Sequence, residues 1–434
     1  MKKLVCVFLT LTVLFGITGC WDSHELDTMF FVTGIGLDTV GNISGNTAGN
    51  TGGNTSGDAG GNTSGSAGGN TSGNAGGQTG EVDVSVQIAK IAGGSSGSGA
   101  SGGISSGSGG SSGDSGSSGI LLEASGKSVL AAISTMRRES TRTLFLQHNQ
   151  MIVFGKELAQ KGIQEHLDMF LRDEESRMET LVLVADGKAK DVLSAELDQD
   201  KLSGVAVFRI MRQYATISTY LNVNMLTLVS RLLKKTAAPL LPIVEVQEEN
   251  QKKKLVISRM AVFKHDRMVG ELNWDEITGY LWTMGQINDG ILEISTDKGT
   301  VSMNIIQASS KLTPVMQSDG RMGVLLNIDT VLDFEELNGF GDVKLEELHG
   351  MLTQEAEKTI ANRVSTTFGK TTQLNADIYE FGDKFRIKYP KQWKSIEQQW
   401  DTLYPSLQLV LNVKAHIVGT GETGFSLDME EKQK

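Results

Sequence analysis

The 434-residue sequence predicts an α/β to α+β protein of several lobes, in which each lobe is a mostly antiparallel or mixed sheet with flanking helices. Three observations predict this class. Several stretches alternate apolar and polar residues, as half-buried strands do, and others repeat apolar residues every three or four positions, as one-sided helices do. Two Gly-rich runs cannot build a core of their own. The strand-rich second half does not suggest a doubly wound nucleotide-binding fold.

The first folded unit is expected to be an α/β domain at 20–186. Its clearest strand is 81–89, where four aliphatic residues alternate with polar neighbours. The other expected elements are strands at 30–38, 120–126, 150–155 and 180–186 and helices at 127–140 and 157–171.

Two low-complexity runs, 41–80 and 93–119, interrupt this domain. The first is almost wholly Gly, Asn, Thr, Ser and Ala and repeats the unit NTSGxAGG three times, and the second is Gly and Ser. These residues have little to bury, so nothing offsets the entropy cost of ordering them. We expect two disordered loop insertions between neighbouring strands, because each doubling of a surface loop costs only about 0.6 kcal/mol.

The remaining chain is expected to form a middle domain at 187–310 and a C-terminal α/β domain at 311–434. A striped stretch at 220–235 is interpreted as a helix packed on its own lobe rather than as a partner-docking or membrane-surface helix. Pro239 and Pro242 should interrupt the chain after it. The further expected elements are strands at 255–263, 291–295, 301–308, 324–334 and 406–417 and a long helix at 343–368.

The first 19 residues have the pattern of a bacterial lipoprotein signal peptide. Two lysines precede an apolar segment at 4–18, which is too short for a bilayer core but suits a signal peptide. The segment ends in Ile-Thr-Gly-Cys, so cleavage is expected before Cys20 and a diacylglycerol group on its thiol. An N-acyl chain on the new amino terminus would add to this covalent anchor, and we expect no other cofactor. An ordinary secretory signal with an incidental cysteine explains fewer of these features.

Composition limits the function further. The only other cysteine, Cys6, leaves with the signal, so the mature chain is expected to have no disulfide and no thiolate metal site. Loss of Lys2 and Lys3 takes the formal charge from −11 to −13. Such an acidic chain does not suit nucleic acid, and its overall charge opposes adhesion to anionic lipid. After the signal no apolar run is long enough to span a membrane.

The sequence contains no catalytic or metal-binding constellation that spacing can identify. Its six histidines are scattered and lack the HExxH pattern, and the acidic stretch at 335–348 lacks the oxygen spacing of a calcium loop. The GxSxG and GxGxxG matches lie inside the Gly-rich runs, where composition explains them. We therefore expect a binding or assembly role and no catalytic or metal-ligating residues.

Several motifs, taken in order, resemble the C subunit of the spore germinant receptors, the GerAC-type germination lipoproteins. Beginning at the expected lipid site, the chain reads CWDSHEL and then FVTGIGLD, and farther on it contains LFLQHNQMIVFGKELAQKGI and FLRDEESR. Near the end it reads MAVFKHDRMVGEL and ADIYEFGDKFRIKYPKQWKSIEQQW. The membrane-proximal motif consists of Trp21, Asp22, Glu25 and Leu26, and the C-terminal motif, interpreted as structural, consists of Gly382, Pro390, Trp393 and Trp400.

This resemblance implies a non-catalytic lipoprotein subunit of a nutrient germinant receptor. Such a subunit would lie on the outer face of the spore inner membrane and assemble with A- and B-type membrane subunits. Whether this subunit binds the germinant itself stays open, as does whether Trp21 and Asp22 orient the domain at the membrane or serve only as processing signals. The alternatives are a solute-binding lipoprotein, which predicts two doubly wound lobes, and a hydrolytic one, which predicts paired carboxylates in a cleft.

Overall fold

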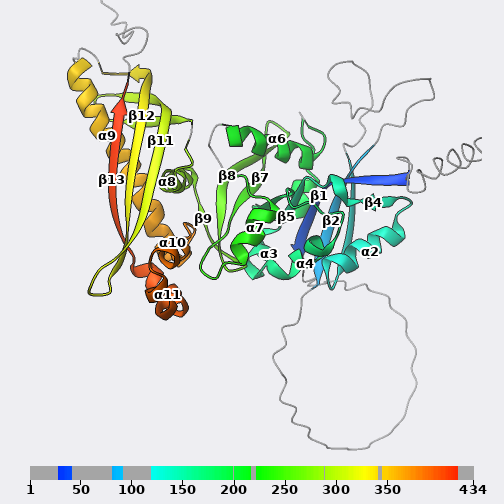
Figure 1. The fold of residues 1–434 in the computed structure, drawn as a ribbon. Coiled ribbons are helices and arrows are strands. Elements are labelled where there is room, and N and C mark those ends of the chain that lie inside the picture. The colour runs from blue at the N-terminus through cyan, green and yellow to red at the C-terminus, as the bar shows by residue number, and fades with distance from the viewer. Residues whose placement is uncertain are drawn as a thin grey trace, which may run out of the picture.

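The structure is a computed structural model that describes residues 28–41, 81–90, 119–198, 200–216, 221–287, 289–340 and 345–418. Cys20, Trp21, Asp22, Glu25 and Leu26 lie outside the described residues, as do the signal peptide and nearly all of the two low-complexity runs. The described chain forms two sheets with helices packed on them (Figure 1). The expected mixed α/β class is therefore confirmed.

The first sheet has nine strands, in the order β3-β2-β1-β5-β6-β7-β8-β9 with β4 beside β1. Its centre, from β1 to β7, is parallel, and the strands on either side pair antiparallel. The strands are β1 (Met29–Thr39), β2 (Val82–Ala89), β3 (Ile120–Gly126), β4 (Thr143–Phe145), β5 (Met151–Phe154), β6 (Leu181–Ala185), β7 (Leu240–Glu249), β8 (Lys252–Lys264) and β9 (Arg267–Leu272).

Helices pack on this sheet, and every residue of β5 and β6 in its parallel centre is buried. They are α2 (Val129–Glu139), α3 (Lys156–Lys161), α4 (Gln164–Arg172), α5 (Ala189–Leu193), α6 (Ser203–Thr216) and α7 (Met225–Leu232). The single helix expected at 157–171 is in fact two helices, because Gly162 between α3 and α4 has a φ of 135°. Only glycine adopts that backbone angle without steric cost, so the helix ends there.

The second sheet has four strands, in the order β10-β11-β12-β13. They are β10 (Ile291–Ser295), β11 (Thr300–Met316), β12 (Met322–Asn338) and β13 (Gln408–Ile417). Two helices, α8 (Trp274–Met284) and α9 (Leu345–Gln373), pack together on this sheet, and α8 also contacts strands of the first sheet (Figure 1). The chain between α9 and β13 folds as α10 (Phe381–Lys388), α11 (Pro390–Ile396), α12 (Trp400–Leu403) and two short 3₁₀ turns.

The domain boundaries expected at 186 and 310 do not coincide with these sheets. Strands β7, β8 and β9 of the expected middle domain extend the first sheet, with Val184 paired to Ile243, and residue 310 lies inside β11. Periodicity identifies a strand and its buried face, but it does not say which sheet supplies its neighbour. The helix expected at 220–235 shortens to α7, which packs on its own lobe through buried Met225 and Leu228.

Candidate functional site

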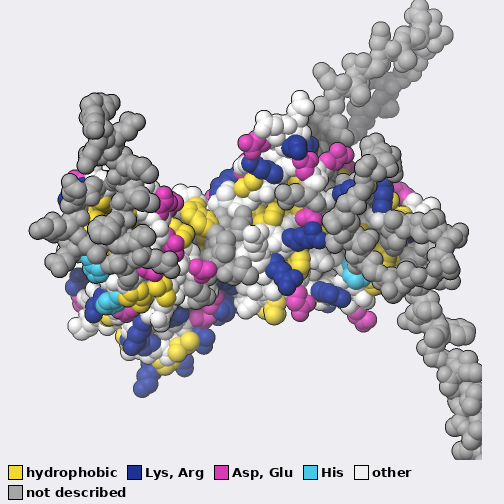
Figure 2. Space-filling model, turned by 90° about the horizontal axis from the view of Figure 1, so that it is seen from above, with side chains coloured by type: hydrophobic (Ala, Val, Ile, Leu, Met, Phe, Trp, Pro, Cys, Tyr) yellow, Lys and Arg dark blue, Asp and Glu magenta, His cyan; other side chains and the backbone are white. Residues whose placement is uncertain are grey.

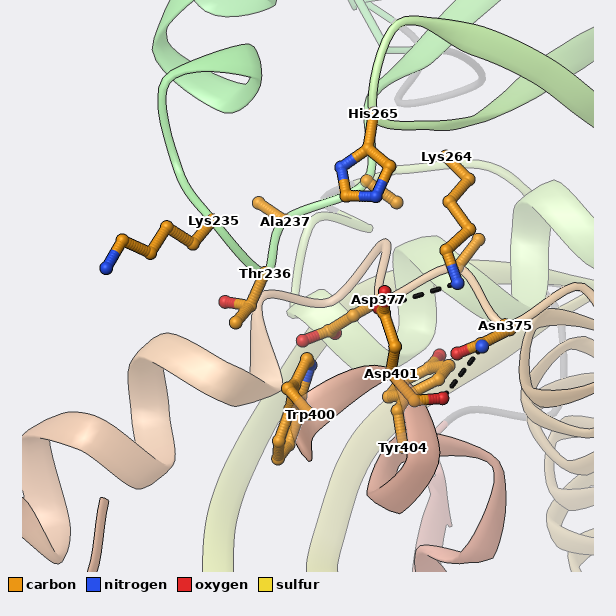
Figure 3. A pocket seen from close by; sticks show the side chains of 12 residues that line it. Lys235, Thr236, Ala237, Lys264, His265, Asn375, Asp377, Trp400, Asp401 and Tyr404 are labelled. Carbon is orange, nitrogen blue, oxygen red and sulfur yellow. Dashed lines mark hydrogen bonds and ion pairs between the residues drawn. The ribbon is translucent and has the colours of Figure 1, made fainter. Parts of the chain in front are cut away.

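Four segments that are distant in the sequence meet between the two sheets (Figure 3). They are residues 235–238 before β7, 264–265 at the β8–β9 turn, 375–382 from the end of α9 into the first turn of α10, and 400–404 at α12. We call these segments the inter-sheet joint. Residues 235–238, 264–265, 375–377, 400–401 and 404 line a partly open pocket of about 10 Å³, which has room for one water molecule.

Asp377 is the buried centre of the joint. Its side chain is 3% exposed. Its carboxylate accepts hydrogen bonds from the backbone N–H groups of Phe381 (2.9 Å) and Gly382 (2.8 Å), while its own carbonyl accepts one from Ala238 N–H (2.9 Å). Asp377 therefore supplies partners for the first turn of α10 and fixes the chain that enters β7.

Burial raises the pKa of Asp377 to about 7, although the two backbone donors act in the opposite direction. Trp400 Nε1 lies beside this carboxylate and also lowers its pKa, but it does not reach hydrogen-bond geometry with any partner. Glu380 raises the pKa through its negative charge. The joint thus contains an acid that titrates far above the usual range of a carboxyl group.

Gly382 lets α10 approach the segment before β7. A Cβ atom at this position would lie 2.4 Å from Thr236 Oγ1 and 2.6 Å from Thr236 Cβ. These distances are shorter than any van der Waals contact, so a larger residue would push α10 away from Thr236. The requirement for glycine here is steric.

Arg231, at the end of α7, links the joint to both sheets. Its guanidinium donates to the carbonyl oxygens of Ala238 and Ile378, both at 3.1 Å, and to the hydroxyl of Tyr280 on α8 at 2.9 Å. It also lies 3.5 Å from the carboxylate of Glu380, which pairs with Lys234 as well. Glu380 has a φ of 58°, so these two cations hold a residue in a backbone conformation that non-glycine residues seldom adopt.

The C-terminal motif residues lie in or beside this joint. Trp393 and Trp400 are buried, with ring centroids 5.2 Å apart, and Trp400 also packs on Phe385 of α10 at 5.8 Å. Pro390 is the first residue of α11. The backbone N–H of that position has no partner within a helix, so proline, which lacks this group, costs no hydrogen bond there. The structure therefore brings Gly382, Trp393 and Trp400 into one packed region, while Pro390 lies exposed at its edge.

Sequence reasoning missed Asp377, Arg231 and Glu380. The signal that could have identified Asp377 is its spacing from Phe381 and Gly382, since an acid just before a helix commonly accepts its first N–H groups. No local pattern marks Arg231, because its partners Tyr280, Ile378 and Glu380 are about 50 and 150 positions away in the sequence.

The hydrogen bonds of the joint hold chain segments from both sheets in place. Across the described ranges, no cluster of three or more His, Cys, Asp or Glu residues could hold a metal ion. His148 packs against Phe31 and Phe145, with centroids 5.3 and 5.4 Å away, and burial lowers the pKa of His166. No helix in the described part of the chain is long and apolar enough to cross a membrane.

Two family descriptions match this chain. "Spore germination protein N-terminal domain" matches residues 72–246, and "Spore germination B3/GerAC like, C-terminal" matches residues 258–421. The gap between the matches, residues 247–257, spans the end of β7 and the start of β8, inside the first sheet.

Relatives from Bacillus subtilis (strain 168) agree with these matches. "Putative spore germination protein YfkR" is 20% identical over 66% of this chain and 75% of the relative, and "Spore germination protein A3" is 22% identical over 93% of each. A match to the crystal structure of the GerBC protein covers 79% of this chain and 95% of the GerBC chain, with a TM-score of 0.49 and 17% identity. On the two domain matches and the two Bacillus subtilis relatives, the chain belongs to the GerAC-like family of spore germination proteins, the C subunits of germinant receptors.

Proposed function

We propose that this chain is the non-catalytic, membrane-anchored C subunit of a nutrient germinant receptor. In this proposal it is held on the outer face of the spore inner membrane by acyl chains on Cys20. It assembles there with A- and B-type membrane subunits, and the complex responds to nutrients by starting germination. The observation that carries the proposal is the match of both halves of the chain to spore germination domains, at 72–246 and 258–421.

The joint supports a scaffolding role within such a complex. Arg231 and Asp377 connect elements of both sheets through hydrogen bonds that are largely removed from water. Buried polar networks of this kind favour one arrangement of the parts they join, because each alternative arrangement leaves polar groups unpaired. A subunit with a defined shape can present the surfaces of its two lobes to two different partners.

Spores that lack this chain provide the first test. Their response to nutrient mixtures is compared with their response to dodecylamine, a trigger that bypasses the receptors. We expect the nutrient response to fall while the dodecylamine response is kept. A normal response to every nutrient mixture in a strain that has no related receptor would contradict the proposal.

The anchor is tested by Cys20→Ala in a strain with this variant as its only copy. Without the thiol no thioether can form, so we expect the protein to leave the membrane fraction and the nutrient response to match that of the deletion strain. Cys6→Ala is the matched control, because it removes the other cysteine from within the expected signal and should change neither property. Membrane association that survives Cys20→Ala would mean that another feature anchors the protein.

A further inference from the structure

Helices α10 and α11 carry a concentrated positive charge on an acidic protein. The segment 384–396, KFRIKYPKQWKSI, contains five basic residues and no acidic one, whereas the whole chain has a formal charge of −11. We call these five side chains the basic ridge, and they are Lys384, Arg386, Lys388, Lys391 and Lys394. In Figure 2, Lys and Arg side chains gather around hydrophobic ones at the lower left end of the molecule, where α10 and α11 lie.

Most of this charge is not neutralised by neighbours. Arg386 pairs with Asp383 at 3.1 Å, and Lys388 donates to the carbonyl oxygen of Pro314 at 2.9 Å. Lys384, Lys391 and Lys394 form no ion pair with any residue that the structure describes.

Nearby acids already have cationic partners from outside the ridge. Glu380 and Asp383 pair with Lys234, and Glu397 pairs with Lys235 at 3.2 Å. The ridge therefore keeps a net positive charge that is available to a partner.

An aliphatic side chain is exposed among these cations. Ile387 is 72% exposed, while Phe381 and Phe385 on the opposite side of α10 are fully buried. The helix is thus firmly seated, and Ile387 points into solvent because of the face on which it lies. Leu233, which immediately precedes Lys234, is 80% exposed. Exposed aliphatic residues flanked by lysine and arginine are typical of surfaces that lie on a membrane.

We propose that the basic ridge contacts the surface of an anionic lipid bilayer, with the cations against lipid phosphates and Ile387 among the headgroups. A bilayer fits better than an acidic peptide, because the cations are spread over a projecting pair of helices and none of them lines a described groove. At physiological salt, charges act over roughly 8 Å, so the ridge governs the local attraction although the whole chain is acidic. This contact goes beyond the proposed receptor role and does not depend on it.

Vesicle sedimentation tests the proposal. The chain from residue 20 onward, with Cys20→Ser so that no acyl group contributes, is mixed with phosphatidylcholine vesicles or with vesicles that contain one third phosphatidylglycerol. We expect binding to the anionic vesicles only, and we expect 0.5 M NaCl to abolish most of it because salt screens the attraction.

Two double variants distinguish the effect of the ridge on vesicle binding from the effect of the net charge of the chain. Lys391→Glu with Lys394→Glu removes two unpaired cations and should weaken binding about tenfold or more. Lys311→Glu with Lys414→Glu makes the same change in net charge at exposed positions on the second sheet and should leave binding within about twofold. Ile387→Ser should weaken binding and make the remainder more sensitive to salt, because it removes only the apolar contact.

Three outcomes would overturn the proposal. The chain with the unaltered ridge could fail to bind anionic vesicles, both double variants could lose binding equally, or the ridge variants could bind vesicles normally and yet lose a cross-link to an acidic protein in spores. The last outcome would assign the ridge to a protein partner. None of these results depends on the germination assay, so failure of the lipid contact and failure of the receptor role are distinguishable.

Discussion

At the scale of single residues, Asp377 shows how burial changes an acid. In water its side chain would be ionised at neutral pH, but in the joint burial raises its pKa from 3.8 to about 7. The folded state therefore holds a proton between about pH 4 and pH 7 that the unfolded state has released. Because proton binding then favours the folded state, its contribution to stability falls as the pH rises through this window and is constant above it.

The direction of this pH dependence gives a measurable prediction. The free energy of unfolding of the unaltered chain should decline between pH 5 and pH 7 more steeply than that of Asp377→Asn, by at most about 1.4 kcal/mol per pH unit. The variant itself should be less stable at low pH, because an amide nitrogen cannot accept the N–H of Gly382.

Urea unfolding at pH 5, 6, 7 and 8 measures both chains, and the difference between them cancels the other titrating groups. Parallel curves for the two proteins would mean that Asp377 is ionised throughout this range in the folded state.

At the scale of elements, glycine decides where helices end and how closely they pack. Gly162 separates α3 from α4, and Gly382 allows α10 to lie against Thr236. Neither effect appears in the hydrophobic pattern that predicted strands and helices. The same pattern missed α8, which is buried on most sides and so shows no polar face, and it missed α6.

Substitution of Gly382 tests the close approach. Gly382→Ala should lower the free energy of unfolding by roughly 1–3 kcal/mol, because the new methyl group overlaps Thr236 and α10 must shift. Gly369→Ala is the matched control, since a Cβ there meets nothing within 4 Å and alanine favours the helix interior. We expect the control to be neutral or up to about 1 kcal/mol more stable. Equal behaviour of the two variants in chemical denaturation would show that α10 does not need its close contact with Thr236.

At the scale of the whole molecule, the first low-complexity run joins two strands that are already neighbours. Thr39 of β1 pairs with Val82 of β2, so the two strand ends that the run connects lie side by side. Deleting residues 42–80 leaves Val40, Gly41 and Glu81 as a three-residue connection, a length that antiparallel hairpins accept.

We expect this deletion to leave the melting temperature unchanged or slightly higher, because a shorter loop loses less entropy on folding. Differential scanning calorimetry measures it, and Val84→Ala in buried β2 serves as the control that should lower the melting temperature. A clear fall for the deletion would mean that the run contributes packing to the folded protein.

The sequence by itself determined the α/β class, most strand positions and the family. Alternation at 81–89 and 406–417 reappears as β2 and β13, because one face of each strand must be apolar wherever its partners lie. The family motifs are likewise local, so they are readable without a fold.

Only the tertiary structure decided how these pieces combine. It joined the expected first and middle domains in one sheet and buried Asp377 beside Trp400. It also left three cations of the basic ridge, Lys384, Lys391 and Lys394, without an ion pair among the described residues. Burial, pKa and ion pairing depend on residues that are up to about 150 positions apart, and local periodicity holds no information about such distances.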